Sequence, residues 1–170
     1  LFVSVNFIDT QYPNQYRTRP SDGSSPTRDM LFRNDFDSAL GHAVFHDVSL
    51  EAGIVWEGYS HSCLVHDFNE DGWPDIYVAN DYLTNDILYI NNHDGTFTDR
   101  VGDIMKHQSY SSMGSDVADI NNDGHDDLFT VEMLPADNKR KKVNISANFY
   151  NHYLFSDQYK YQFQYVRNVF

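Results

Sequence analysis

The sequence predicts an all-β fold built from repeated units of short antiparallel strands, and three observations support it. The apolar segments are short, rich in β-branched and aromatic residues, and bounded by Asn, Asp and Gly, as strands are. The helical period of 3.6 residues is nearly absent, and only 38–44 and 99–106 are weak candidates for a helical turn or two. Finally, the chain of 170 residues repeats itself.

The repeat emerges when the sequence is shifted by 52 residues. Residues 45–80 then match 97–132 at nine of 36 positions without a gap, whereas chance gives about two. The identities include Phe45 with Phe97, Ser60 with Ser112, and five positions of an acidic loop. A repeated loop of this kind indicates a repeated structural unit.

The segments that we expect to form strands recur in a fixed order. They are 1–3, 31–34, 76–78, 88–91, 128–130 and 165–168, and Asn-His-Asp-Gly-Thr at 92–96 predicts a hairpin turn. We expect about three repeats, at approximately 1–50, 51–102 and 103–170, truncated at both ends, with another acidic loop upstream of Leu1. Units of this length made of short strands are typical of β-propeller blades, at least four of which close a ring.

The acidic loops have the residue types that calcium requires. Both follow the pattern Asp-x-Asn-x-Asp-Gly-x-x-Asp, and Ca²⁺ prefers six to eight oxygen ligands. Gly at the sixth position permits the tight turn that such a loop needs. The candidate ligands are the side chains of Asp67, Asn69, Asp71 and Asp75 with the carbonyl of Trp73, and the side chains of Asp119, Asn121, Asp123 and Asp127 with the carbonyl of His125.

An EF-hand and a metal-free turn are the other interpretations of these loops. An EF-hand needs Glu at position 12 and flanking helices, whereas Val78 and Thr130 stand there within predicted strands. A solvated turn rich in Asn and Asp, without metal, is the alternative to a calcium site. We expect two Ca²⁺ ions whose role is to stabilise the fold rather than to catalyse a reaction.

The strongly negative net charge of the chain argues against some classes of binding partner. Twenty-five acidic residues stand against 12 Lys and Arg, and the net charge of −13 argues against nucleic acid and against an anionic membrane surface. No apolar run is long enough for a membrane helix. The single cysteine, Cys63, excludes an internal disulfide, and its strand-like surroundings predict a buried structural thiol.

The motifs in 67–135 resemble the FG-GAP-like, or VCBS, repeat. The pattern D-x-N-x-D-G-x-x-D-[IL]-[YF] followed by L-Y-x-N-N-x-D-G-T-F carries the resemblance. Tyr-Val-Ala-Asn-Asp at 77–81 and Glu-Met-Leu-Pro at 132–135 are similar to large bacterial proteins of the ASPIC/UnbV, or cartilage acidic protein-like, group. The resemblance implies a calcium-binding propeller of an exported protein, extracellular or at the cell surface, and it implies no known activity.

The histidines, the basic run, the aromatic C-terminal segment and the long loop near the N-terminus carry no recognisable catalytic or metal-binding motif. We expect the histidines, including His61 and His66, to be packing or surface residues rather than zinc ligands. The basic run Lys139–Lys142 is expected to be a solvated loop end. In 148–170, Tyr161, Phe163 and Tyr165 alternate with polar residues, which predicts a strand with one aromatic face. The long loop 6–30 is a candidate binding loop.

These observations predict a binding or adhesion module that recognises a protein or a glycan, or joins other subunits of a surface complex. No residues are identified as catalytic, so we do not expect an enzyme. A propeller-type polysaccharide lyase or glycoside hydrolase, and a purely structural subunit, are the alternatives.

Overall fold

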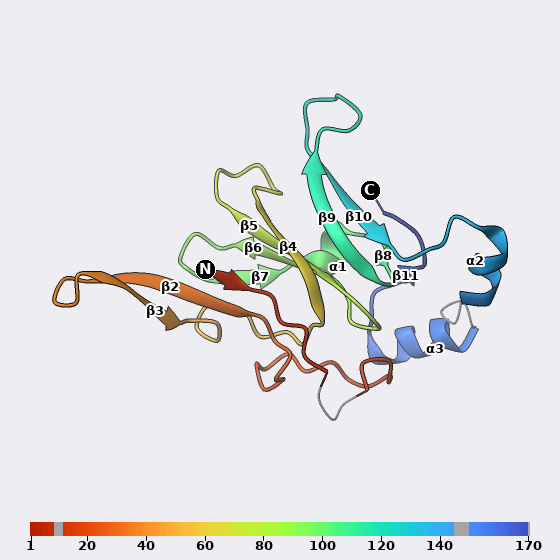
Figure 1. Cartoon of the computed structure of the whole chain (residues 1–170), viewed down its shortest axis with the longest axis horizontal. Helices are drawn as coiled ribbons and strands as arrows, with labels where there is room; N and C mark the ends of the chain where they lie inside the picture. Colours follow the sequence, from red (N-terminus) through yellow and green to blue (C-terminus); the bar gives the residue numbers. More distant parts are fainter. Residues whose placement is uncertain (9–11, 145–149, 170) are drawn as a thin grey trace.

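A computed structural model of the chain describes residues 1–8, 12–144 and 150–169 and consists mostly of β-strands in small sheets (Figure 1). The strands are β1 (Phe2–Val3), β2 (Met30–Asp37), β3 (His42–Asp47), β4 (Ser60–His66), β5 (Asp75–Asn80), β6 (Ile87–Asn91), β7 (Phe97–Asp99), β8 (Gln108–Ser109), β9 (Ser112–Ala118), β10 (Asp127–Glu132) and β11 (Gln164–Tyr165). The prediction of a mainly β protein is confirmed at this level.

The central sheet has four antiparallel strands in the order β4-β5-β6-β7. Every residue of β5 is buried, because one of its faces packs towards β1 and β2 and the other towards β9 and β10. A four-stranded antiparallel sheet of consecutive strands is the unit from which propellers are built. The predicted hairpin lies between β6 and β7, where Asn91 pairs with Phe97.

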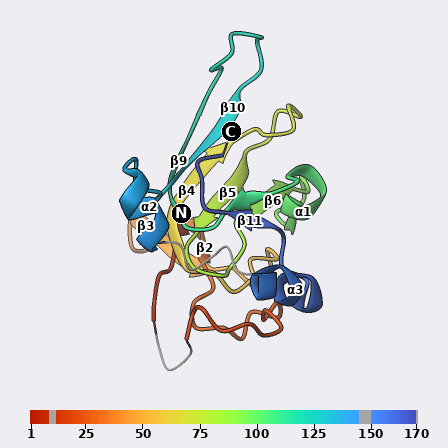
Figure 2. The same cartoon turned by 90° about the vertical axis from the view of Figure 1, so that its right-hand side faces the viewer.

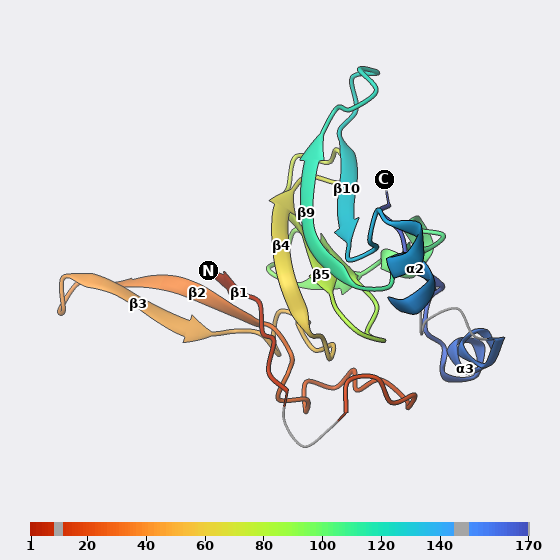
Figure 3. The same cartoon turned by 45° about the vertical axis from the view of Figure 1, so that its right-hand side comes forward.

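The next two strands repeat the first two of the central sheet. The bounds of β9 and β10 are those of β4 and β5 shifted by 52 residues. Each pair also contains the same irregularity, since His61 in β4 and Met113 in β9 have no partner in the register. Figure 3 shows β4 and β9 side by side, and Ser62 Oγ lies 2.8 Å from Ser115 Oγ. The sequence offset is therefore also a structural offset.

The first sheet has the order β1-β2-β3. The hairpin of β2 and β3 extends well beyond the central sheet in Figure 1. Near its base, Phe2 and Leu31 pack against the buried Ile76, Ile87 and Tyr89 of the central sheet. These contacts form the hydrophobic interface between the first and second sheets.

Of the three helices in the described residues, one was predicted and two were not. Helix α1 (Val101–Ile104) falls within the candidate 99–106, whereas 38–44 forms a turn and the start of β3, so that candidate was wrong. The helices α2 (Asn138–Asn144) and α3 (Tyr150–Tyr159) were not predicted and are seen most clearly in Figure 2. Neither has an apolar stripe: the basic run occupies α2, and exposed Tyr153, Leu154 and Phe155 are consecutive in α3.

The predicted aromatic strand is also wrong. Residues 150–159 form helix α3, and within 150–169 only Gln164 and Tyr165 form a strand, in a short parallel pairing with β8. Tyr161 and Gln164 are buried there, whereas Phe163 and Tyr165 are exposed, so the three aromatic residues do not share one buried face. Phe149 and Phe170, which belonged to the same prediction, lie outside the described residues.

Candidate metal-binding loops

The two acidic loops occupy equivalent places in the fold. The first connects β4 to β5 and the second connects β9 to β10. Both project from the same end of their strand pairs (Figures 1 and 3). The predicted ligand residues therefore lie in two separate loops, five positions in each.

The first loop is held by its own side chains. Asp67 accepts hydrogen bonds from the backbone N–H groups of Asp71 (3.0 Å) and Gly72 (2.7 Å). Asn69 Oδ1 also accepts from Asp71 N (3.1 Å), and Asp71 Oδ1 accepts from Trp73 N (2.9 Å). These bonds curl the backbone around the carboxylates.

The second loop reproduces this pattern bond by bond. Asp119 accepts from the N–H groups of Asp123 (3.0 Å) and Gly124 (2.9 Å), Asn121 Oδ1 from Asp123 N (2.9 Å), and Asp123 Oδ1 from His125 N (2.9 Å). The glycines at the sixth position have φ of 87° and 91°, which a residue with a side chain rarely adopts. The shared sequence pattern thus produces one shared backbone conformation.

The loops differ at their last position. Asp75 is fully buried and accepts hydrogen bonds from Phe68 N (3.0 Å) and Asn91 N (2.8 Å). Asp127 is partly exposed and accepts from Ile120 N (3.1 Å), the equivalent of Phe68. Asp75 therefore ties its loop to β6, a contact that the second loop does not make within the described chain.

Histidines connect the loops to their surroundings. His93 Nε2 lies 2.8 Å from Asp71 Oδ2, and this hydrogen bond holds the pKa of Asp71 below its usual value. His125 Nδ1 lies 2.6 Å from Glu70 Oε1 and so bridges the two loops, which raises the pKa of His125. The Trp73 ring stacks on His93 at a centroid distance of 5.0 Å.

The donor chemistry of each loop suits a hard cation, but the side chains are not gathered around a point. Among residues 1–8, 12–144 and 150–169, no three His, Cys, Asp or Glu side chains are grouped so that they could hold a metal ion. The oxygens instead accept backbone N–H bonds, and a carboxylate retains further lone pairs beyond those bonds. Calcium binding remains a prediction for both loops.

Sequence reasoning missed a second repeated feature, a buried aspartate that joins neighbouring sheets. Asp29 Oδ1 accepts from Val5 N (2.8 Å) and from Ser60 Oγ (2.7 Å) at the start of β4. Asp86 accepts from Asn80 N (2.7 Å) and from Ser112 Oγ (2.9 Å) at the start of β9. Each aspartate thus links its own sheet to the first strand of the next.

Burial is the largest influence on the pKa values of both aspartates. Desolvation raises the pKa of Asp29 and of Asp86 to about 6. A signal for them exists in the sequence, because each stands two residues before the strand residues Leu31 and Leu88. The pattern Asp-x-Leu-[Phe/Tyr]-x-Asn would have identified the pair.

The long loop near the N-terminus is anchored by two arginines. Arg17 forms an ion pair with buried Glu57, and Arg19 donates hydrogen bonds to the carbonyls of Glu57 (2.7 Å) and Asn85 (3.2 Å). The Arg19 guanidinium also lies 5.3 Å from the centre of the Trp56 ring. This part of the loop is held firmly against the central sheet, which makes it a poor candidate for an adaptable binding loop; its residues 9–11 lie outside the described chain.

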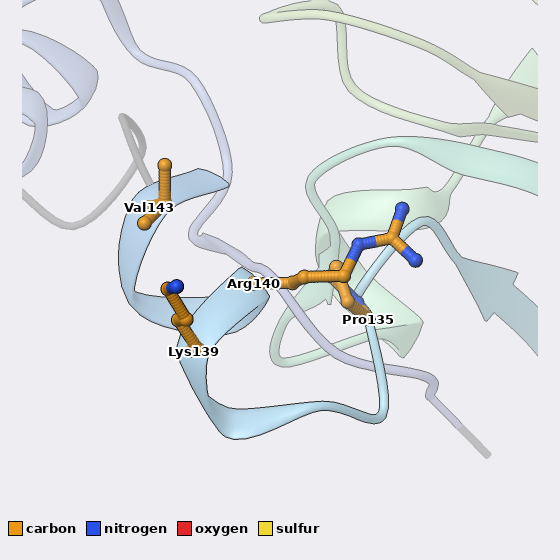
Figure 4. Close-up of a pocket in the computed structure, with 4 residues that line it drawn as sticks. All are labelled: Pro135, Lys139, Arg140 and Val143. Atoms are coloured by element: carbon orange, nitrogen blue, oxygen red, sulfur yellow. The ribbon is translucent and has the colours of Figure 1, made fainter.

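The other singled-out residues have ordinary surroundings. His61 and His66 each face a different carboxylate, Asp81 at 3.4 Å and Asp126 at 3.2 Å. Cys63 is only half-buried, although partial burial still raises the pKa of its thiol. The basic run lies on α2 rather than in a loop, and there Lys139 and Arg140 line a hollow with Pro135 and Val143 (Figure 4).

Comparison with known families assigns one part of the chain. A family model described as an FG-GAP-like repeat matches residues 67–130. The matched segment begins at the first residue of the first loop and contains both loops. A search of curated proteins found no match to the chain. An FG-GAP-like repeat is thus found here, whereas the narrower VCBS and ASPIC/UnbV assignment stays a prediction.

The helices of the described residues are short. None of them is long and apolar enough to cross a bilayer.

Proposed function

We propose that this chain is part of a calcium-stabilised, β-propeller-type binding or adhesion module. The observation that carries the proposal is the bond-by-bond equivalence of the two acidic loops at an offset of 52 residues. A turn that only has to reverse the chain does not need three carboxylates and an amide in one nine-residue segment. A divalent cation would remove the repulsion between these carboxylates, which is otherwise unfavourable.

The residues present have the chemistry that Ca²⁺ requires. In the first loop Asp67, Asn69, Asp71 and Asp75 would contribute side-chain oxygens and Trp73 its carbonyl oxygen, and the matching residues would do so in the second loop. Bound calcium would supply positive charge that stabilises the loop between two strands. In the proposal it takes part in no reaction.

The module would present a partner-binding surface on a rigid β scaffold. We propose a protein or glycan as the partner and an exported or cell-surface location in a bacterium, on the basis of the resemblance of the motifs in 67–135 to exported bacterial repeat proteins. Nucleic acid is disfavoured by the net charge of −13.

A calorimetric Ca²⁺ titration of chelator-stripped protein, with the melting temperature followed in parallel, tests the calcium proposal. We expect two sites and a rise in melting temperature that grows with Ca²⁺ concentration, because a ligand that binds only the folded state stabilises it. The variants Asp67→Ala and Asp119→Ala should each remove one site. Asp157→Asn, an exposed change on α3, is the control. Absence of binding, together with an unchanged melting temperature, would refute the calcium proposal.

A further inference from the structure

A pocket lies between the first and second sheets, away from the acidic loops. Its volume is about 420 Å³, within the range of small-molecule sites. One wall is β2 with Leu31, Phe32 and Arg33, and another is the turn after β3, which includes Glu51. The third wall is the β6–β7 hairpin with Asp94 and Phe97. The pocket is therefore formed by two neighbouring repeats.

The walls are fixed relative to one another by backbone contacts. Phe97 N donates a hydrogen bond to the carbonyl of Ala52 (2.8 Å), which joins β7 to the turn after β3. Gly53, with φ of 81°, lies against the same segment, because a Cβ there would come within 2.6 Å of the Phe97 carbonyl oxygen. A side chain at position 53 would push the walls apart. The pocket is thus a preorganised feature of the interface.

The hairpin presents a carboxylate to the pocket in a defined position. Asp94 Oδ1 accepts hydrogen bonds from Thr96 N (3.0 Å) and Thr96 Oγ1 (2.6 Å), which fixes the turn. Both bonds use Oδ1, so the other oxygen keeps its lone pairs for a ligand. Beside it, the space where Gly95 would carry a Cβ holds no atom within 4 Å. Asp94 is itself exposed, so a ligand can reach its carboxylate from solvent.

The opposite wall adds a second carboxylate and a cation. Glu51 is exposed at the pocket, and its charge acts on Arg33. The Arg33 guanidinium is held by Asp35 through Nε (3.1 Å) and Nη2 (3.1 Å) and therefore has a defined orientation. Two carboxylates and one already paired cation make the rim acceptor-rich and unfavourable for an anion. The lining also includes apolar residues, among them the aromatic Phe32 and Phe97.

We propose that this pocket binds one unit of a neutral sugar. A neutral pyranose has hydroxyl groups that can donate to carboxylates and accept from a guanidinium, and C–H faces that pack on aromatic rings. The lining of the pocket offers these partners together. The proposal rests on the proposed function as a binding module and specifies its ligand class and site.

The test uses nitrogen-15-labelled protein of the full chain and four methyl glycosides, those of glucose, galactose, mannose and xylose. Each is titrated to about 50 mM, enough to detect a millimolar Kd. We expect at least one glycoside to shift the amide signals of Thr96 and Phe97. Glu51→Gln and Asp94→Asn should each weaken that binding by about tenfold or more, because each removes a charged acceptor. Asparagine at 94 keeps the oxygen that fixes the turn. The control is Asp157→Asn, which changes the charge equally at a distant site on α3.

Three results would overturn the proposal. The first is the absence of shifts at the pocket with all four glycosides. The second is equal sugar affinity in the wild type and in both pocket variants, with unchanged melting temperatures. The third is that Nα-acetyl-lysine amide, whose side-chain ammonium makes it a cationic probe, shifts the same signals while no sugar does. None of these results affects the Ca²⁺ titration, so failure of the pocket is distinguishable from failure of the calcium-stabilised module.

Discussion

The two aspartates that join neighbouring sheets occupy the same position but have different partners. Asp86 Oδ2 accepts from Tyr77 Oη (2.6 Å) and Ser112 Oγ, whereas Asp29 Oδ2 is buried without a hydrogen-bond partner among the described residues. The strand register explains the difference, because Tyr77 pairs with Leu88 as Phe2 pairs with Leu31. Phe2 is thus the counterpart of Tyr77 without its hydroxyl group.

The two acidic loops likewise have the same local structure but different surroundings. Nine residues set the backbone conformation of each loop, and the loops agree in their internal bonds. Neighbouring strands set burial, and here the loops differ: β6 covers Asp75, while Asp127 stays partly exposed. Repeated sequence therefore fixes local geometry, and the surroundings decide how much each copy contributes to stability.

The largest expected effect on stability comes from replacing the last aspartate of each loop, and the two loops should differ in the size of the loss. In chelator, Asp75→Ala should lower the free energy of unfolding by about 3 kcal/mol, because two partly buried N–H groups lose their acceptor and a cavity replaces a fully buried side chain. Asp127→Ala should lower it by about 1 kcal/mol, since one N–H loses its acceptor at a partly exposed site. Urea denaturation of both variants measures the difference. Equal losses would contradict the role assigned to β6.

The pH dependence of stability tests the buried state of Asp29. Its folded pKa of about 6 lies above the unfolded value, so its contribution is fully favourable below about pH 4 and is lost as the pH rises through 6. The loss amounts to about 3 kcal/mol. Asp29→Asn should remove this component from the stability curve between pH 4 and 7. A curve parallel to that of the wild type would show that Asp29 is not desolvated.

A smaller effect should come from exchanging the counterparts Phe2 and Tyr77. Tyr77→Phe should destabilise by about 1–2 kcal/mol, because Asp86 loses one of its hydrogen-bond donors. Phe2→Tyr should give Asp29 Oδ2 a donor, stabilise the fold by about 1 kcal/mol and lower the pKa of Asp29. Denaturation at pH 7 and titration of the Asp29 carboxyl by NMR measure both effects. Destabilisation by Phe2→Tyr would contradict the equivalence of the two positions.

Local and periodic features were predictable from the sequence, and contacts between distant segments were not. The offset of 52 residues, the hairpin at 92–96 and the loop positions all follow from short patterns. Helices α2 and α3 lack an apolar stripe and so gave no periodic signal. The anchoring of Arg17 and Arg19 on Glu57 and the junction of Asp29 with Ser60 span about 30 to 40 residues of chain, and such contacts become visible only in the fold.

Luminescence of terbium, which substitutes for calcium in oxygen-ligand sites, tests the central claim most directly. The indole of Trp73 lies within the first loop, so excitation of tryptophan should produce Tb³⁺ emission from that site. We predict emission that saturates with added Tb³⁺, falls when Ca²⁺ is added and is lost in Trp73→Phe, while Trp56→Phe retains it. Emission that is absent, or that survives both Ca²⁺ competition and Trp73→Phe, would contradict a calcium site in the loop from Asp67 to Asp75.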